Sequence, residues 1–304
     1  MLQPILTIEN LVEGTIIKRP SKHIKTPYVA DILMSAPIDE DMREEVLGHT
    51  ASLGCCGLAD TGATILMAPI VSSKPTQCKY KVFLSIVRTK NGTEIDENER
   101  IIGIHPKLAE DLTENALKCN LLQKLQNVKR YARETVIYAE GKVDSRFDFT
   151  GIDENGCPFI MEVKNVPLAD YEDITAKERK GKCYDDIDSN AKVAYFPDGY
   201  RKKRTDTVSP RALKHIKELT LIKRCSRTRC IMCYVIQRTD VNRFQISVLD
   251  PEYRMAVKEA IESGVEVITM VIQWTREGRA YFVRDDLPMT PIEAINSATK
   301  CSGI

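Results

Sequence analysis

Two charged residues, Glu162 and Lys164, stand inside the stretch FIMEVKN at positions 159–165, which otherwise has the apolar and β-branched composition of a buried strand. Alternate side chains of a strand lie on the same face, so this carboxylate and this ammonium group are expected to lie side by side. A lone E-x-K tripeptide is common by chance and usually forms an ordinary ion pair at the rim of a sheet. Further residues must therefore decide whether the pair belongs to a chemical site.

A second carboxylate comes from the segment upstream. SRFDF, at residues 145–149, is predicted to be a strand that carries Asp148. The intervening TGIDENGC contains Asn155-Gly156, a dipeptide typical of tight turns, so the two strands are expected to form a hairpin that brings Asp148 beside Glu162. An acid on one strand followed by E-x-K on the next is the layout of the PD-(D/E)xK nuclease core.

These residue types suit the hydrolysis of a phosphodiester. Two carboxylates at the end of a sheet can bind a hard divalent cation, Mg²⁺ or Mn²⁺, through their oxygens. Such a cation polarises the scissile phosphate and helps to generate hydroxide from water, and Lys164 can orient that water or stabilise the developing charge. The predicted catalytic residues are therefore Asp148, Glu162 and Lys164, with Asp148 and Glu162 as metal ligands. A purely structural Asp–Lys–Glu network is the alternative.

Positive charge is concentrated in one segment of a nearly neutral chain. The net charge is +1, but residues 201–229 are rich in Lys and Arg and contain only two acids, Asp206 and Glu218. Such a segment is the footprint expected of a polyanion site, with a solvated basic face as the alternative. Its start, YRKKR, is too charged to pack and is expected to be a mobile arm.

A helix is predicted over residues 210–223, with Ser209 as its N-cap and Pro210 in its first turn. Leucine and isoleucine at three-residue spacing within 213–219 form its buried stripe, which leaves the basic residues facing solvent or a cleft. The predicted nucleic-acid contacts are Lys202, Lys203, Arg211, Lys214, His215 and Lys217, together with Thr61 of the turn DTGAT. For His215, a packing or hydrogen-bonding role is an equally good prediction.

The chain is predicted to contain two domains and to be of the α+β class. Residues 1–92 contain short runs rich in Val, Ile, Thr and Tyr, which favour a small all-β barrel, and Gly62 in DTGAT is expected to adopt a positive φ. The polar segment RTKNGTEIDENER is interpreted as a turn or linker. Residues 93–304 mix strands with helices and are predicted to form an α/β domain around a central sheet, with an inserted polar loop near residues 168–194.

Two further helices of this domain are marked by their ends. HPKLAEDLTENALK places Pro106 in a first turn and puts Leu108 and Leu112 on one helical face. A helix over residues 251–262 is preceded by Asp250, which suits an N-cap, and is followed by a glycine that suits the position beyond a helix end. These signals predict where each helix begins and ends.

Composition narrows the class of protein. Hydrophobic residues make up 43% and charged residues 29% of the sequence, as in a globular chain, and no apolar run is long enough to span a membrane. The first residues lack the basic start and apolar core of a signal peptide. The cysteines are scattered, and Cys230 and Cys233 stand in CIMCYVIQ, which favours a buried strand over a metal site. We therefore expect a soluble, cytoplasmic protein with reduced thiols.

Four stretches, in this order, resemble the sugar fermentation stimulation protein family: SRFDF, FIMEVKNVPL, AYFPDG and RALKHIKEL. With DTGAT and the segment DPEYRMAVKEAIESGVEVI, the resemblance covers most of residues 14–285. It implies an N-terminal oligonucleotide-binding (OB) type of barrel followed by a PD-(D/E)xK nuclease-like domain, and a metal-dependent nuclease that binds nucleic acid. By position it implies Asp148, Glu162 and Lys164 as the active site, with Glu134 as a further acid of the metal site.

Other positions match or depart from the family pattern. Lys214 and His215 match its K-H pair, and Asp198 matches the acid of its F-P-D motif, but Asn115 stands where the family usually has Glu. The intact trio favours a nuclease, whereas this departure favours a non-cleaving DNA-binding, regulatory protein that retains the fold. A protein-interaction scaffold is a third interpretation. The sequence leaves open DNA or RNA, single or double strands, and the oligomeric state.

Overall fold

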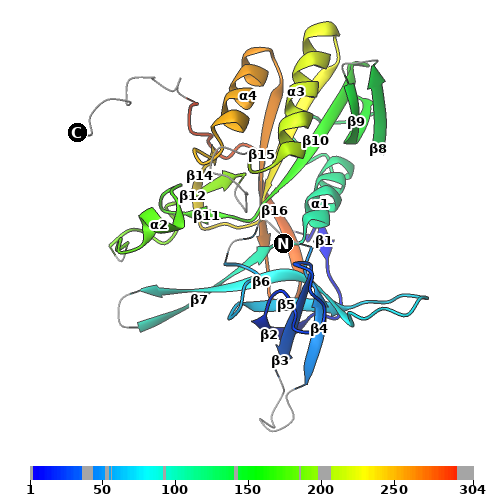
Figure 1. The fold of residues 1–304 in the computed structure, drawn as a ribbon. Coiled ribbons are helices and arrows are strands. Elements are labelled where there is room, and N and C mark those ends of the chain that lie inside the picture. Colours follow the sequence, from blue (N-terminus) through cyan, green and yellow to red (C-terminus); the bar gives the residue numbers. More distant parts are fainter. Residues whose placement is uncertain are drawn as a thin grey trace.

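The computed structural model describes residues 3–35, 44–51, 55, 57–91, 94–139, 143–184, 186–197 and 207–292. In this part of the chain the strands outnumber the helices and form three sheets: a six-stranded sheet at the bottom of Figure 1, a seven-stranded sheet packed against helices above it, and a small three-stranded sheet. The predicted mixture of α and β structure is therefore confirmed. No helix in the described ranges is long and apolar enough to cross a membrane.

The six-stranded sheet is built by the N-terminal part of the chain. In pairing order its strands are β4 (Glu45–His49), β3 (Val29–Met34), β2 (Val12–Lys18), β5 (Thr64–Pro69), β6 (Tyr80–Asn91) and β7 (Glu94–Gly103). β4 also pairs with β6, with Gly48 opposite Tyr80, so the sheet curls until it closes on itself. The closed sheet surrounds an apolar core that includes Ile16, Ile32 and Ile65.

The segment RTKNGTEIDENER, which we interpreted as a turn or linker because of its polarity, belongs to a hairpin and does not link two separate units. It forms the facing ends of β6 and β7, which remain paired as far as Asn91 and Glu94. Arg88 and Glu99 lie opposite each other on these strands, and their side chains are 3.0 Å apart. Charges that suggested a linker thus include a cross-strand ion pair. The predicted domain boundary falls within this hairpin, and the first sheet continues to the end of β7.

The seven-stranded sheet takes strands from both ends of the described chain. In pairing order they are β1 (Leu6–Thr7), β16 (Arg279–Arg284), β15 (Glu266–Trp274), β13 (Arg229–Ile236), β10 (Pro158–Val166), β9 (Val143–Ile152) and β8 (Arg130–Ala139). β10, β13 and β15 are parallel neighbours whose mostly apolar sequences are buried on both faces. Because β1 pairs with β16, the start of the chain belongs to this sheet and not to the N-terminal unit predicted to contain it.

Helices cover both faces of the seven-stranded sheet. α1 (Pro106–Lys118) packs on one face, and α3 (Pro210–Cys225) and α4 (Pro251–Glu262) pack on the other, where they run side by side in Figure 1. Each helix has a proline in its first turn, and Ser209 and Asp250 accept backbone N–H groups as N-caps. The predicted helix starts are confirmed because capping depends on residues close in sequence.

Residues 168–194, predicted to be an inserted loop, contain some regular structure. β11 (Ala169–Asp170) pairs with β12 (Lys192–Phe196), β12 pairs with β14 (Val241–Ile246), and α2 (Ala176–Arg179) forms one turn between β11 and β12. A buried ion cluster anchors this small sheet, because Lys192 and Arg238 each lie 2.7 Å from Asp240. Arg238 also donates to the carbonyl of Pro167 at 3.1 Å, which ties the small sheet to the end of β10.

Candidate functional site

Asp148 lies at the point where two strands separate. β9 and β10 form the predicted hairpin, and their backbone pairing ends at Phe149 and Met161. One residue further, the Asp148 Oδ2 atom accepts the backbone N–H of Val163 at 2.7 Å, where a neighbouring strand would otherwise supply a carbonyl. The hairpin therefore brings the Asp148 carboxylate next to the E-x-K segment, as the sequence predicted.

Glu162 is the most enclosed member of the predicted trio, with 2% of its surface exposed. Its Oε1 atom contacts both the Lys164 ammonium group and Nδ1 of His215, which reaches it from α3. Its Oε2 atom is buried and has no hydrogen-bond partner among the described residues. Because a buried carboxylate oxygen without a partner is costly, this atom marks a position suited to a cation or a donor from a ligand.

The two carboxylates have opposite electrostatic environments. Burial, followed by repulsion from the Glu162 carboxylate, raises the pKa of Asp148 to about 6. Burial also acts to raise the pKa of Glu162, but the Lys164 ammonium and the hydrogen bond to His215 outweigh it, and this pKa is held below its ordinary value. Asp148 is thus the acid whose negative charge is poorly compensated, as expected for a group that awaits a positive partner.

A cleft of about 310 Å³ opens onto these side chains. It lies where the first sheet, α1, the small sheet and the start of α3 meet the middle of β9 and the last part of β10. Its lining consists of Cys55, Ile104, Pro106, Ala109, Glu110, Asp148, Glu162, Val163, Lys164, Asn165, Pro167, Leu168, Tyr195, Phe196, Ser209 and Arg211. The three predicted catalytic residues are therefore brought together in one cleft.

Glu110, which sequence reasoning missed, supplies a third carboxylate to the cleft. It lies on α1, where Arg133 of β8 pairs with it at 2.9 Å and also with Asp111 and Glu114. In the family pattern the acid of this helix is expected at the position of Asn115. The Asn115 amide instead donates to the carbonyl of Ile5 at 2.7 Å and so holds β1 in place. The only available signal for Glu110 was its place on a polar flank of α1, which many surface residues share.

The structure does not bring Glu134 to the cleft. This residue is exposed on β8, and its carboxylate lies 3.2 Å from the guanidinium of Arg146. Its φ of 52° places the backbone in the left-handed region, which is unusual for a residue inside a strand. Exposed and half-buried side chains alternate along β8, and Glu134 falls on the exposed face, so the family resemblance that implied this residue is not matched by its position.

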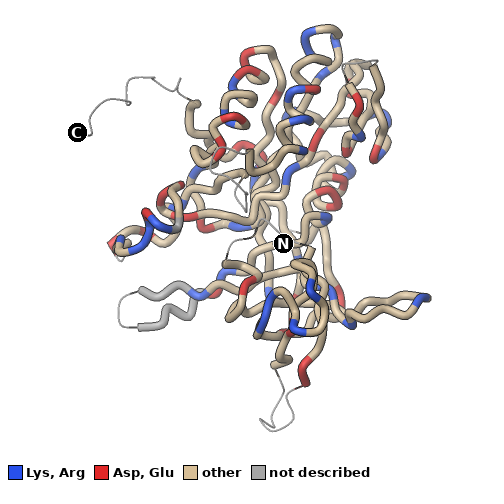
Figure 2. The backbone as a smooth tube through the Cα atoms, viewed as in Figure 1, with Lys and Arg blue, Asp and Glu red and all other residues tan. Residues whose placement is uncertain are grey.

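The predicted cationic residues of α3 differ in their surroundings, although Figure 2 shows Lys and Arg at several points along this helix. Arg211 is exposed and lines the cleft. Lys214 donates to the backbone carbonyl of Asp144 at 2.5 Å, and Lys217 pairs with Glu252 of α4 at 3.0 Å. Among these three, Arg211 is the cation whose position faces the trio.

The remaining predicted contacts lie elsewhere. Lys202, Lys203 and Asp198 are outside the described residues. Thr61 is exposed in a turn of the first sheet and does not line the cleft. The adjacent Gly62 has a φ of 93°, which confirms the positive φ predicted for the DTGAT turn.

The cysteines of CIMCYVIQ are packed inside the protein. Cys230 and Cys233 are fully buried in β13, and burial raises the pKa of each thiol to about 12. A thiol that resists ionisation is a poor metal ligand. The prediction of a buried strand at this position is therefore confirmed.

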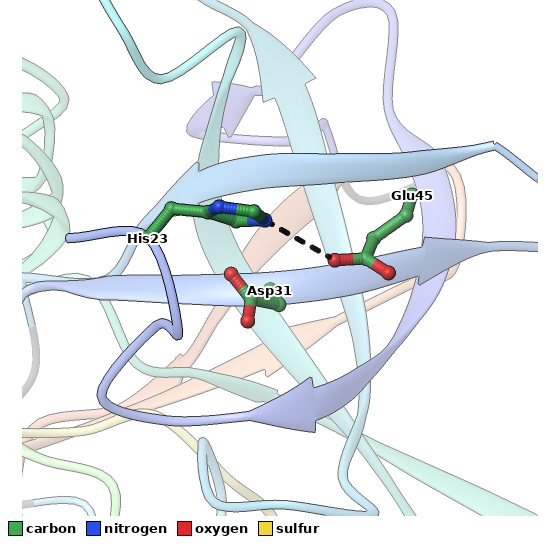
Figure 3. Close-up of side chains that lie close together, drawn as sticks. All are labelled: His23, Asp31 and Glu45. Atoms are coloured by element: carbon green, nitrogen blue, oxygen red, sulfur yellow. Dashed lines mark ion pairs between the residues drawn. The ribbon is translucent and has the colours of Figure 1, made fainter.

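A separate group of potential ligands lies in the first sheet, where Figure 3 shows His23, Asp31 and Glu45 close together. Their ligand atoms lie within 4.8 Å of one another, and in the described part of the chain no other three such residues do so. However, Asp31 accepts hydrogen bonds on both oxygens, from the hydroxyl of Ser21 and the backbone N–H of Lys22. Glu45 pairs with the Lys22 ammonium at 2.5 Å. These partners already satisfy the two carboxylates without a metal ion.

Comparison with known proteins places this architecture in a family. Residues 107–278 match the family model described as the SfsA (sugar fermentation stimulation protein) RE domain, a span that contains Glu110, Asp148, Glu162 and Lys164. This chain belongs to the SfsA family. The family predicted from SRFDF and FIMEVKNVPL is thereby confirmed.

Relatives from bacteria align with most of the chain. The sugar fermentation stimulation protein homolog of Jannaschia sp. (strain CCS1) is 31% identical over 237 residues, which cover 77% of this chain and 81% of the relative. The homolog of Nostoc sp. (strain PCC 7120) is 28% identical over 89% of this chain and 92% of its own length. The solved structure of Pyrococcus furiosus SfsA in complex with Ca²⁺ matches 95% of this chain and all of the other, with a TM-score of 0.68 and 18% identity. At that identity the likeness shows a shared SfsA fold.

Proposed function

We propose that this SfsA-family protein is a metal-dependent nuclease that hydrolyses phosphodiester bonds in nucleic acid. The observation that carries this proposal is the Glu162 Oε2 atom, which is buried without a partner beside Asp148 and Lys164 in the cleft. Two carboxylates and a lysine converging on one cleft suit phosphoryl chemistry better than an isolated salt bridge.

The proposed fold assignment follows the same residues. We interpret the closed first sheet as an OB-type barrel and the seven-stranded sheet with its helices as a PD-(D/E)xK-like domain. The hairpin of β9 and β10 followed by the parallel strand β13, with helices on both faces, supports this interpretation. In this arrangement the barrel lies beside the cleft and can bind the strand that the second domain cleaves.

The residues present fit a hard divalent cation, Mg²⁺ or Mn²⁺. Asp148 and Glu162 would hold it through carboxylate oxygens, and Mg²⁺ commonly uses one or two carboxylates together with waters and substrate phosphate. A bound ion would supply Lewis-acid polarisation of the phosphate and a more acidic water. The Ca²⁺ of the Pyrococcus furiosus SfsA structure, an oxygen-seeking cation, is consistent with such a site in this chain.

Other side chains have separate roles in the proposal. Lys164, 12% exposed, is placed to stabilise negative charge on the phosphate during cleavage. His215 contacts Glu162 from behind, with its ring 5.7 Å from that of Phe147, and is therefore a positioning residue rather than a phosphate ligand. Arg211, at the start of α3, is placed to bind a flanking phosphate.

The direct test is incubation of the purified protein with labelled single- and double-stranded DNA and RNA, in Mg²⁺, Mn²⁺ or EDTA. We expect cleavage with either cation and none in EDTA. Cleavage that persists in EDTA would contradict the metal assignment. Binding without cleavage under every condition would favour the second candidate, a non-cleaving nucleic-acid-binding protein. This second candidate is supported by the contacts of Glu162 with Lys164 and His215, because they balance the charge of this carboxylate without a metal ion.

Replacing Lys164 with alanine is expected to lower the cleavage rate by about 10²-fold, the usual effect of losing one electrostatic stabiliser. Metal affinity measured by titration calorimetry should persist, because Asp148 and Glu162 remain. The matched control is Lys258→Ala on α4, a partly buried lysine that pairs with Glu262 away from the cleft. A Lys164→Ala protein that cleaves at the wild-type rate would remove Lys164 from the mechanism.

Replacing Arg211 with alanine is expected to weaken binding of all sequences alike. With one phosphate contact fewer, binding releases fewer counterions from the nucleic acid. The magnitude of the slope of log affinity against log salt should therefore fall by about 1. Lys217→Ala on the same helix is the control, because Lys217 pairs with Glu252 and should change the slope less. Fluorescence anisotropy over a range of salt concentrations measures both. Equal slopes for wild type and Arg211→Ala would show that this residue is only solvated.

A further inference from the structure

The cleft has a second kind of wall besides its charged residues. Ile104, Pro167, Leu168 and Phe196 line it together with the carboxylates and Lys164. Phosphate and metal ions gain no favourable contacts from an apolar surface, whereas nucleobases commonly pack on aromatic and apolar side chains. The volume of about 310 Å³ is at the small end of the range for pockets that enclose a ligand. The cleft therefore suits one nucleotide unit rather than a stack of paired bases.

The apolar wall is fixed by the packing between the two halves of the protein. Leu168 follows β10, and Tyr195 belongs to β12. These two side chains are part of the same core cluster as Cys55 and Ile104, beside the first sheet. Both are more than nine-tenths buried. Widening the cleft for a duplex would pull these side chains out of that core and expose them to water, which is unfavourable. The cleft is thus preformed at its present width.

Phe196 is the aromatic side chain best placed to meet a base. It is partly buried, lines the cleft, and is supported by the rings of Tyr234 and Tyr253 at centroid distances of 5.8 and 5.6 Å. Such support fixes its orientation, so little conformational entropy is lost when a ligand packs against it.

Positive groups surround the same space. α1 and α3 both begin at the cleft, and neither has an acidic residue in its first turn to oppose the positive end of its dipole. Lys164 and Arg211 add full charges, and Glu162, whose buried Oε2 atom has no partner among the described residues, lines the cleft beside them. An anionic backbone next to an apolar base would therefore meet matching surfaces.

We infer that the substrate is a single-stranded polynucleotide, or an unpaired segment of a duplex, with one base lodged against Leu168 and Phe196 and its phosphate beside Lys164 and Arg211. This inference rests on the proposed function and narrows its substrate class. A base inside a duplex is held by stacking and pairing and reaches such a pocket only after it is unpaired. Blunt duplexes are accordingly poor ligands.

The experiment measures binding by fluorescence anisotropy in EDTA, so that no cleavage occurs. Four labelled probes of one sequence are compared: single-stranded DNA, single-stranded RNA, blunt duplex DNA, and the duplex with a single-stranded overhang. We expect at least one single-stranded probe and the overhang probe to bind about tenfold more tightly than the blunt duplex. The two single-stranded probes distinguish the sugar that the cleft prefers. Equal affinity for the blunt duplex, or no binding of any probe, would overturn the inference; the cleavage assay in Mg²⁺ or Mn²⁺ tests the proposed nuclease separately.

Substitution of Phe196 tests the base-binding wall directly. Phe196→Leu keeps the apolar volume but removes the aromatic face, and it is expected to lower affinity for the single strand by about fivefold or more while leaving duplex binding unchanged. Phe282→Leu on β16, another partly buried aromatic residue but one outside the cleft, is the matched control. Circular dichroism establishes that each variant is folded. Wild-type affinity of a folded Phe196→Leu protein for the single strand would overturn the placement of the base.

Discussion

Replacing Asp148 with asparagine is expected to abolish binding of Mg²⁺ or Mn²⁺ and to reduce cleavage by about 10²-fold or more, while making the metal-free protein more stable at neutral pH. The loss follows because one of the two carboxylates placed to hold the ion becomes a neutral amide. The gain in stability follows because burial and the nearby Glu162 carboxylate both make the negative charge of Asp148 unfavourable. A residue kept for function at a cost in stability shows this combination.

The sign of the stability effect follows from the pKa. Burial and the neighbouring Glu162 raise the pKa of Asp148 from an ordinary value of 3.8 to about 6 in the folded protein. The protonated form is thus favoured by folding, and this contribution is fully present below pH 3.8 and is lost as the pH rises through about 6. A shift of this size corresponds to about 3 kcal/mol. Asparagine remains neutral, so its advantage over aspartate should reach about 3 kcal/mol at pH 7.5 and shrink toward pH 4.

Chemical denaturation in EDTA at several pH values measures this difference, and titration calorimetry measures metal binding. Asp144→Asn is the matched control, because Asp144 lies on the same strand with its side chain exposed and outside the cleft. It should change neither stability nor metal affinity appreciably. An Asp148→Asn protein that still binds the ion with wild-type affinity would refute the metal site. One that is less stable than wild type at pH 7.5 would refute the electrostatic account of Asp148.

The second large effect is a loss of stability expected on substitution of Asp240, which lies outside the cleft lining. This carboxylate is fully buried and lies between the Arg238 guanidinium and the Lys192 ammonium, both of which are also buried. Burial acts to raise its pKa, but Arg238 and Lys192 outweigh burial and hold the pKa well below the ordinary value. Asp240→Asn would leave two buried cations without their counter-charge. Breaking a buried ion pair in this way costs about 3–5 kcal/mol.

Urea denaturation of wild type and Asp240→Asn tests this prediction. The chain offers a close control in Arg284 and Asp286, which have the same spacing and the same 2.7 Å separation but are about half exposed. Asp286→Asn should cost less than about 1 kcal/mol, because solvent screens the pair. Similar, small losses for both variants would show that the small sheet does not depend on its buried ions.

Sequence by itself determined those parts of the site that depend on neighbours along the chain. The Asn-Gly turn and two short apolar runs were enough to predict the hairpin of β9 and β10, and with it the proximity of Asp148, Glu162 and Lys164. Caps and prolines predicted the starts of the helices for the same reason, since a cap bonds to backbone groups only a few residues away. Ordered motifs predicted the SfsA family, which the comparisons show.

Only the tertiary structure decided which distant residues complete the cleft. Glu110 reaches it from α1, and His215 of α3 contacts Glu162 from outside the cleft lining; each is separated by many residues from the strands it serves. The apolar wall likewise exists because Leu168 and Tyr195 pack into the core of the first sheet. Local rules of turns, caps and alternation say nothing about such contacts, because many pairings of the same elements would satisfy them equally well. The burial of apolar surface between the elements selects one pairing, and that choice places Glu110 in the cleft and Glu134 outside it.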